Sequence, residues 1–212
     1  GTNAALAARR GAALVEARLD LADAGALERW IAGGELGAFL GGAEPAVLVN
    51  NAGLLQPIGP LEAQDIAAVS RAVAVNVGAA LALAAAFAAA TTGVRDRRIL
   101  HISSGAGSTA YAGWSVYCAT KAALDHHARA VALDRSPGLR IASVAPGVVD
   151  TDMQAEIRET DESRFPDRAR FVELKREGRL RRPEDAGAEL VDYLLADAFG
   201  RETVTDLRRV SA

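Results

Sequence analysis

The stretch Ala46-Val47-Leu48-Val49-Asn50-Asn51-Ala52-Gly53 joins a short apolar run to a polar turn that ends in glycine. Four consecutive apolar residues without alternation are typical of a strand buried on both faces of a parallel sheet. We therefore predict a strand over Ala46–Val49. The turn at Asn50–Gly53 then lies at the carboxyl end of that strand, where its glycine permits backbone conformations that other residues avoid.

The same alternation of strand and helix continues on both sides of this stretch. Further strands are predicted at Leu14–Leu19, Arg98–Ile102, Leu139–Val144 and Thr203–Leu207. Helices are predicted at Ala24–Leu40, Pro60–Ala90, Gly113–Asp134, Arg164–Glu177 and Glu184–Ala196, the first of them weakened by glycines at 33, 34 and 37. Strands that alternate with helices of this length indicate βαβ units, an α/β fold and a mostly parallel sheet.

Length and composition narrow the class of protein. A chain of 212 residues fits one domain with a full core, so residues 1–212 are assigned to a single domain. The net charge of −3 gives no electrostatic reason to expect nucleic acid or an anionic membrane as a partner. The one cysteine, Cys118, suits a reducing cytoplasm. We expect no membrane-spanning run, since Val73–Ala90 comes closest and has the character of a buried helix.

Tyr117 and Lys121 lie four residues apart in the stretch Trp114–Lys121, a spacing that places both on one face of a helix. A fixed positive charge beside a phenol favours the phenolate, so Lys121 is expected to lower the pKa of Tyr117 towards the working pH of an acid–base catalyst. The chain has only two lysines and is otherwise rich in arginine, which makes a lysine at this position informative. A chance coincidence at helical spacing is the alternative.

Polar and glycine-containing segments follow four of the predicted strands. They are Asp20, Asn50–Gly53, Ser103–Gly105 and Pro146–Thr151. In open parallel sheets, ligands bind beyond the carboxyl ends of the strands. These segments are therefore expected to converge on one crevice beside the helix that carries the Tyr/Lys pair.

Taken together, these residues resemble the short-chain dehydrogenase/reductase family. The resemblance rests on the NNAG turn at Asn50–Gly53, Asn76 in a helix, Ser104 placed 13 residues before Tyr117, Lys121, and Pro146-Gly147 followed by Thr151. It implies a Rossmann-like, doubly wound parallel sheet with helices on both faces. It also implies hydride transfer with a nicotinamide cofactor.

A narrower resemblance points to the sepiapterin reductase/benzil reductase branch of that family. It is carried by Gly113–Cys118, by Ala145–Gln154 and by the Leu-Lys-x-x-Gly-x-Leu pattern within Phe171–Arg182. The branch implies an NADPH-dependent carbonyl reductase that acts on ketones or vicinal dicarbonyl compounds. Family interfaces built from helices imply a homodimer or homotetramer.

The resemblance also implies catalytic roles for Asn76, Ser104, Tyr117 and Lys121. Tyr117 would donate a proton to the substrate carbonyl, Ser104 would hydrogen-bond the same oxygen, and Lys121 would hold the nicotinamide ribose. Asn76 would hold a water that links Lys121 to solvent, although it could instead satisfy backbone groups. Ser103 is expected to be a turn residue. Tyr111 has no lysine four residues later and is expected to be a pocket or surface aromatic.

Binding residues follow from the same motifs. The predicted cofactor-binding residues are Asp20, Leu21, Asn50, Ala52, Gly53, Tyr117, Lys121, Pro146, Gly147, Val149, Thr151 and Met153. The predicted substrate-binding residues are Ser104, Gly105, Trp114, Gly147 and Asp206. Asp20 has an alternative role as a turn acid, Trp114 as a packing residue and Asp206 as a polar residue at a strand end. Residues 152–182 are predicted to form a substrate lid, whose charged part, Asp152–Arg170, is expected to be solvated and mobile.

No metal site is predicted. His101, His126 and His127 lack metal-ligand spacing with cysteines or carboxylates, so a structural or exposed position is expected for each.

One family motif has no counterpart in this sequence. The glycine-rich TGxxxGxG turn should follow a first strand, and Gly33-Gly34-Glu35-Leu36-Gly37 cannot replace it because no strand leads into it. The N-terminal strands of the sheet are therefore expected to be missing, which would separate the strand before Asp20 from the rest and expose sheet edges. Either the native protein has an upstream segment and is a working reductase, or it is a non-catalytic scaffold or dimerisation relative. An epimerase-type relative is disfavoured by the NNAG turn.

Overall fold

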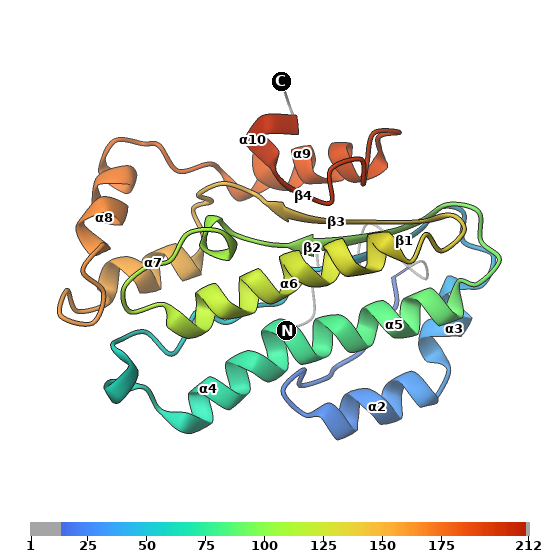
Figure 1. Cartoon of the computed structure of the whole chain (residues 1–212), viewed down its shortest axis with the longest axis horizontal. Helices are drawn as coiled ribbons and strands as arrows, with labels where there is room; N and C mark the ends of the chain where they lie inside the picture. The colour runs from blue at the N-terminus through green and yellow to red at the C-terminus, as the bar shows by residue number, and fades with distance from the viewer. Residues whose placement is uncertain (1–13, 211–212) are drawn as a thin grey trace.

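The computed structural model describes residues 14–210. Its centre is a four-stranded parallel sheet in the order β1-β2-β3-β4 (Figure 1). The strands are β1 (Ala46–Asn50), β2 (Arg97–Ile102), β3 (Leu139–Ala145) and β4 (Val204–Asp206). Each predicted strand from β1 onwards is confirmed to within a few residues. Within residues 14–210, no strand precedes β1.

Helices cover both faces of the sheet, as expected for the α/β class. Helices α4, α5 and α6 lie on one face, with α2 and α3 outside them, whereas α9 and α10 lie on the other (Figure 1). The bounds are α2 (Ala24–Ala32), α3 (Glu35–Leu40), α4 (Ile66–Val73), α5 (Ala80–Ala90), α6 (Ser115–Leu133), α7 (Asp152–Glu159), α8 (Arg168–Arg176), α9 (Pro183–Leu195) and α10 (Leu207–Val210). Short turns of 3-10 helix, η2 (Leu61–Ala63) and η4 (Gly105–Gly107), precede α4 and α6.

Successive residues of the strands serve opposite faces, because side chains alternate across a strand. Ile99 of β2 packs with Phe87 of α5 and Ala128 of α6 in one buried cluster. Its neighbour Leu100 packs with Leu194 of α9 in a second cluster. This burial on both sides explains why the strands read as continuous apolar runs.

The long helical segment that was predicted over Pro60–Ala90 contains an irregular turn. Between α4 and α5, the residues Ala74–Ala79 form a π-helix, termed η3. Its hydrogen bonds span five residues instead of four, and such turns are frequent at functional sites. Asn76 lies within this turn and is fully buried.

The run Ile66–Ala90 is long and apolar enough to cross a membrane by length and composition alone. The expectation that no apolar stretch reaches this length is therefore wrong. Ala80, Ala84 and Phe87 of this run are nevertheless buried, and α5 packs against β1 and β2. The sequence predicted that Val73–Ala90 is a buried helix, and the inner face of α5 is buried as expected.

Leu14–Leu19 does not form the predicted strand. Its residues have no regular structure and pair with no other strand, and Val15 is 63% exposed. The prediction is wrong because an apolar pattern does not supply the neighbouring backbone that a strand needs for its hydrogen bonds. Within the described residues, the segment therefore lies apart from the sheet.

The segment Asp152–Arg170 is more ordered than expected. Helix α7 begins at Asp152 and buries Ile157, and Phe165 is fully buried. Both side chains join a buried cluster with Trp114 and Tyr117. Most of the stretch is exposed or half-buried, as expected from its charges, but scattered apolar residues anchor it to the core. Its mobility as a lid stays a prediction.

Gly138 begins the turn into β3 and has a left-handed φ of 72°. A Cβ at this position would lie 2.4 Å from the backbone oxygen of Arg95. We expect Gly138→Ala to lower the free energy of unfolding by about 2–4 kcal/mol, measured by urea denaturation. Gly187→Ala is the matched control, since a Cβ there meets nothing within 4 Å inside α9. It should leave stability unchanged or raise it by up to about 1 kcal/mol. Equal effects of the two variants would contradict the described turn.

Candidate active site

One face of α6 carries three buried polar side chains at helical spacing. They are Tyr117, Lys121 and Asp125, which are 7%, 4% and 4% exposed. Residues four apart on a helix share a face, and here that face is turned towards the carboxyl end of β2. The predicted pairing of Tyr117 with Lys121 on one helix face is therefore confirmed by the geometry.

The Lys121 ammonium is tied to the strand end. Its Nζ donates a hydrogen bond of 2.7 Å to the backbone oxygen of Ile102, the last residue of β2. Burial lowers the pKa of Lys121 to about 8, and the negative charge of Asp125 acts in the opposite direction. The same ammonium lies beside Gly53: a Cβ added at Gly53 would be 3.5 Å from Lys121 Nζ.

Burial is the largest influence on Tyr117, and it raises the pKa of the phenol. The Ser104 hydroxyl lowers that pKa to a smaller extent, and Cys118 raises it. The expectation that a neighbouring Lys121 brings the pKa of Tyr117 down is wrong, because burial raises that pKa and the opposing contribution comes from Ser104. Lys121 Nζ lies 5.7 Å from the centre of the Tyr117 ring. Tyr117 is consequently a protonated phenol at neutral pH.

The two serines after β2 have different environments. Ser103 is buried and donates its hydroxyl hydrogen to Asp125 Oδ1 at 2.7 Å. The Ser104 hydroxyl caps η4 by accepting from the Ala106 N–H at 3.2 Å, and it faces Tyr117. Ser103 is thus committed to a buried partner, whereas Ser104 is the serine placed beside the phenol, in agreement with the predicted choice between them.

Asn76 holds the loop that follows β1. Its Oδ1 accepts from the Leu54 N–H at 2.7 Å, and its Nδ2 donates to the Leu54 oxygen at 2.8 Å and to Thr120 Oγ1 at 3.1 Å. The Thr120 hydroxyl in turn donates to the backbone oxygen of Tyr117. The structure therefore contains the backbone contacts that were the alternative role for Asn76. The role of Asn76 in holding a water stays a prediction.

Asn50 also has a buried partner. Its Nδ2 donates to the Ala80 oxygen and lies 3.1 Å from His101 Nδ1, and His101 Nε2 lies 3.0 Å from His127 Nδ1. Burial lowers the pKa of His101 to about 3, so this histidine is neutral at physiological pH. The expectation of structural roles for these histidines agrees with this placement. Within residues 14–210, no group of three metal-ligating side chains is assembled.

A cavity of about 630 Å³ opens beside this polar face. It is lined by the β1 loop, with Gly53 and Leu54, and by α7, with Met153 and Glu156. The Tyr117 hydroxyl lies 3.9 Å from Met153 Sδ, which brings the phenol to the cavity wall. The predicted lid segment therefore contributes one side of the candidate binding site.

Asp20 is placed at the rim of the same cavity through Arg71. Both Asp20 oxygens accept from the Arg71 guanidinium, at 3.1 and 3.2 Å, and Arg71 lines the cavity. The Ala22 N–H and Arg71 lower the pKa of Asp20. Neighbouring Leu21 is half-buried, and Ala52 is exposed in the turn after β1. Arg71 is a site residue that the sequence motifs did not indicate.

The turn after β3 presents Pro146 and Gly147. Gly147 has a left-handed φ of 83°, and a Cβ there would lie 3.5 Å from Arg181 and 3.8 Å from Arg208. The Arg181 guanidinium donates to the Pro146 oxygen at 3.3 Å, and Val149 bridges to Arg181. This turn leads directly to α7, whose N-cap is Thr151.

Asp206 ends β4 and accepts two hydrogen bonds from the Arg208 side chain, at 2.8 and 2.6 Å. This pairing lowers the pKa of Asp206. Because Arg208 also lies beside Gly147, the three residues occupy the same edge of the sheet. The charge of Asp206 is balanced within the chain.

Of the two roles between which the sequence did not decide, Trp114 has the packing role, since it is 4% exposed and lines neither cavity. Its ring stacks on Phe165 at 4.4 Å between centroids and meets Tyr117 edge-on at 5.6 Å. Tyr111 also packs on Trp114, at 5.2 Å, and is half-buried. The indole thus fixes the phenol by packing. Gly105 opens η4 on the far side of Ser104.

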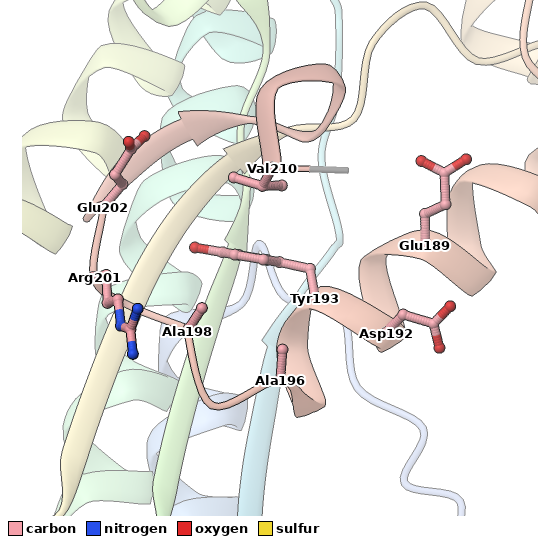
Figure 2. A pocket seen from close by; sticks show the side chains of 8 residues that line it. All are labelled: Glu189, Asp192, Tyr193, Ala196, Ala198, Arg201, Glu202 and Val210. Carbon is pink, nitrogen blue, oxygen red and sulfur yellow. The ribbon is translucent and has the colours of Figure 1, made fainter. Parts of the chain in front are cut away.

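A second cavity, of about 540 Å³, lies away from these residues (Figure 2). It is formed by α9, the loop after it and α10, with Tyr193 across its middle and Asp192 and Glu202 at its edges (Figure 2). The predicted catalytic residues line neither cavity, but the first cavity lies next to them, since its wall residues Gly53 and Met153 adjoin Lys121 and Tyr117.

The residues between the first cavity and the turn after β3 fit the nicotinamide end of a dinucleotide. Gly53 lines the cavity with the Lys121 ammonium beside it, and Gly147 gives the turn that leads into α7 its left-handed backbone. The sequence motifs did not indicate Thr120 or Asp125 as part of this arrangement. Their spacing from Lys121 on α6 was the signal available, since Asp125 lies four residues beyond it.

The chain is similar to known short-chain dehydrogenases and reductases. The sequence pattern of the short chain dehydrogenase family matches residues 11–162. A benzil reductase ((S)-benzoin forming) of Bacillus cereus is 38% identical over 156 residues, which are 72% of this chain and 63% of that protein. A sepiapterin reductase of Meriones unguiculatus is 35% identical over 164 residues, or 74% of this chain and 61% of that protein.

Among solved structures, a short-chain dehydrogenase/reductase from Burkholderia vietnamiensis is 48% identical. The likeness covers 99% of this chain and 83% of that one, with a TM-score of 0.68. The chain spans about three fifths of the length of the curated relatives it matches.

Loss of the Asn76 amide should weaken the fold around the β1 loop. Asn76→Ala leaves the Leu54 backbone and Thr120 without their buried partner. We expect the free energy of unfolding to fall by about 2–3 kcal/mol in urea denaturation. The control is Asn51→Ala, since Asn51 is exposed in the same loop and should change stability by less than about 0.5 kcal/mol. An Asn76 variant as stable as the control would contradict the clamp.

Proposed function

The chain belongs to the short-chain dehydrogenase family, and from this premise we propose that it is an NADPH-dependent carbonyl reductase. Its substrate in this proposal is a ketone or a vicinal dicarbonyl compound. The observation that carries the proposal is the buried face of α6, where Tyr117 faces Ser104 and Lys121 lies one turn further along. A cavity adjoins that face.

Five residues would hold the nicotinamide end of the cofactor. Gly53 and Met153 line the cavity, Lys121 lies beside Gly53, and Gly147 and Thr151 belong to the turn that leads into α7. The reduced nicotinamide, when bound, supplies a hydride to the carbonyl carbon. NADPH is proposed over NADH because the sequence motifs resemble a branch whose members use it, and a solved relative that is 29% identical has bound NADP.

Tyr117 would supply the proton. Because burial keeps its pKa raised, the phenol is protonated at neutral pH and can donate to the substrate oxygen as negative charge develops there. The Ser104 hydroxyl would donate a second hydrogen bond to the same oxygen. Lys121, charged below its pKa of about 8, would stabilise the phenolate that remains until a proton returns from solvent.

A diaryl diketone such as benzil is our first candidate substrate, because the chain is similar to relatives named as benzil reductases. Trp114 and Phe165, which stack beside Tyr117, are 4% and 0% exposed, so they hold the phenol in place by packing. Sepiapterin is the second candidate. Asp206 is an anchor for its pterin only if that ligand displaces Arg208.

We also propose a homodimer or homotetramer in the cytoplasm. Ile66 and Val73 of α4 and Leu133 at the end of α6 are exposed apolar residues on the outer side of the helical layer. Apolar side chains in such positions are suited to burial between subunits. The cysteine at position 118 is free, which agrees with a reducing compartment.

Tyr117→Phe tests the proton donor. It should lower kcat for benzil reduction by about 10²–10⁴-fold, because the ring and its packing remain while the acidic proton is lost. NADPH consumption at 340 nm measures the rate, and circular dichroism checks the fold. Tyr111→Phe is the control and should retain most activity, since Tyr111 contacts Arg170 and not the predicted reacting groups. Wild-type turnover by the Tyr117 variant would refute the assignment.

Cofactor binding separates the enzyme from a non-catalytic scaffold. We expect the full-length protein to quench or shift NADPH fluorescence, more strongly than that of NADH, and to turn over benzil faster than sepiapterin. Absence of NADPH binding by the full-length protein would favour the scaffold. Binding with preference for sepiapterin would keep the reductase and replace the proposed substrate.

A further inference from the structure

Asp125 is a buried carboxylate that the proposed reaction does not use. It is 4% exposed and lies on α6, one turn beyond Lys121 and two turns beyond Tyr117. Removing a carboxylate from water is costly unless hydrogen bonds and an opposite charge compensate for it. A buried acid at this position therefore calls for a physical account.

Two hydroxyl groups meet the same oxygen of Asp125. Ser103 and Ser143 each donate to Oδ1 at 2.7 Å, and both serines are buried. Ser103 directly follows β2, whereas Ser143 lies within β3, where it pairs with His101 of β2. The carboxylate thus bridges the two central strands near their carboxyl ends.

The backbone of η4 closes over the carboxylate. A Cβ on Gly107 would lie 2.4 Å from Asp125 Oδ2 and 3.2 Å from Ser103 Oγ. Ser104, the predicted oxygen-binding serine, is the N-cap of this same turn. Only glycine permits η4 to approach the carboxylate so closely, and the position of Ser104 depends on that approach.

One face of α6 contacts three successive residues at the end of β2. Lys121 Nζ binds the oxygen of Ile102, and Asp125 binds the hydroxyl of the next residue, Ser103. Tyr117 faces the residue after that, Ser104. Three successive residues of one strand end are therefore held by one helix face.

The groups around Lys121 leave Asp125 as its counter-charge within residues 14–210. On its own helix, Lys121 faces Asp125 and the protonated Tyr117. From β2 it faces His101, which is neutral because its pKa is about 3. Neutral groups come from the turn after β1 and from Asn76 of η3.

We propose that Asp125 is a positioning residue of the active site, which fixes the ends of β2 and β3 through Ser103 and Ser143 and keeps Lys121 in its ammonium form. Its part in carbonyl reduction rests on the proposed function. It does not touch the reacting atoms and acts through Ser103, the η4 turn and Lys121. Its electrostatic effect on Lys121 exists without substrate or cofactor, which makes it measurable separately.

The test uses the scarcity of lysine. The chain contains two lysines, Lys121 and Lys175, so incorporation of lysine labelled with ¹³C at Cε gives two signals whose pH titrations are followed by NMR. In Asp125→Asn the acceptor oxygen for both serines is retained while the charge is lost. We expect the titration midpoint of Lys121 to move to lower pH, because burial then acts unopposed. Lys175, which is half exposed, should keep its midpoint.

Ser143→Ala is the matched control. It removes one hydrogen bond to Asp125 and keeps the negative charge, so the thermal midpoint should fall while the Lys121 titration stays in place. An Asp125→Asn variant with an unchanged Lys121 midpoint overturns the proposal. An equal shift in Ser143→Ala also overturns it, because altered packing and not charge would then be the cause.

A second variant decides the case in which Asp125→Asn does not fold. The double variant Ser103→Ala/Ser143→Ala keeps the carboxylate without either hydroxyl donor. A Lys121 midpoint at or above the wild-type value supports the counter-charge, and a lowered midpoint overturns it.

The enzymatic readout is kept apart from this titration. In the full-length protein, Asp125→Asn should lose a larger fraction of kcat at pH 8 than at pH 6.5, because less Lys121 is charged at the higher pH. A proportional loss at both pH values overturns the role of Asp125 in catalysis. If wild-type protein reduces no carbonyl compound, the proposed function fails, while the Lys121 titration still decides the electrostatic role of Asp125.

Discussion

A single buried ammonium determines how the site is arranged. Lys121 donates to the backbone oxygen of Ile102 at the end of β2, and so fixes both the rotation and the height of α6 against the sheet. An ammonium removed from water requires such partners, since its desolvation otherwise costs several kcal/mol. With this contact in place, Tyr117 one turn earlier must face Ser104, and Asp125 one turn later must meet the adjacent serine. The chemistry at the cavity is thus a consequence of one helix-to-strand contact.

Elements whose pattern reports burial were predictable from the sequence. Ala46–Val49 and Leu139–Val144 match β1 and β3 to within one residue, because strands covered on both faces must be continuously apolar. Leu14–Leu19 has a similar character but lacks a neighbour, and pairing is a property of the whole sheet that no local pattern contains. Helix α7 was missed because Asp152–Glu159 is mostly polar and is held by a few apolar anchors from distant parts of the chain.

The candidate site also has features that could be predicted from the sequence and features that could not. The shared face of Tyr117 and Lys121 follows from helical geometry and could be predicted. The direction of the pKa of Tyr117 could not, because it depends on how deeply the fold buries the phenol. Asn76 was found as a motif residue, but its partner Leu54 lies 22 positions away and emerges only in three dimensions. Asp125 was overlooked since the sequence does not tell which strand residues a helix will face.

Because Ala74–Ala79 form a π-helical turn, the orientation of α4 relative to α5 depends on how many residues the turn contains, and not only on which residues they are. Such a turn holds one residue more than an α-helical hydrogen-bonded ring would, and each residue advances a helix by about 100°. Deletion of one residue within the turn would let α4 and α5 run on as a regular helix. The cavity-lining side chains Ala68 and Arg71 would then swing by about that angle relative to Phe87 in the core. The orientation of the rim of the site relative to the core therefore depends on the number of residues in this turn. A deletion there would change that orientation even though every remaining side chain keeps its chemistry.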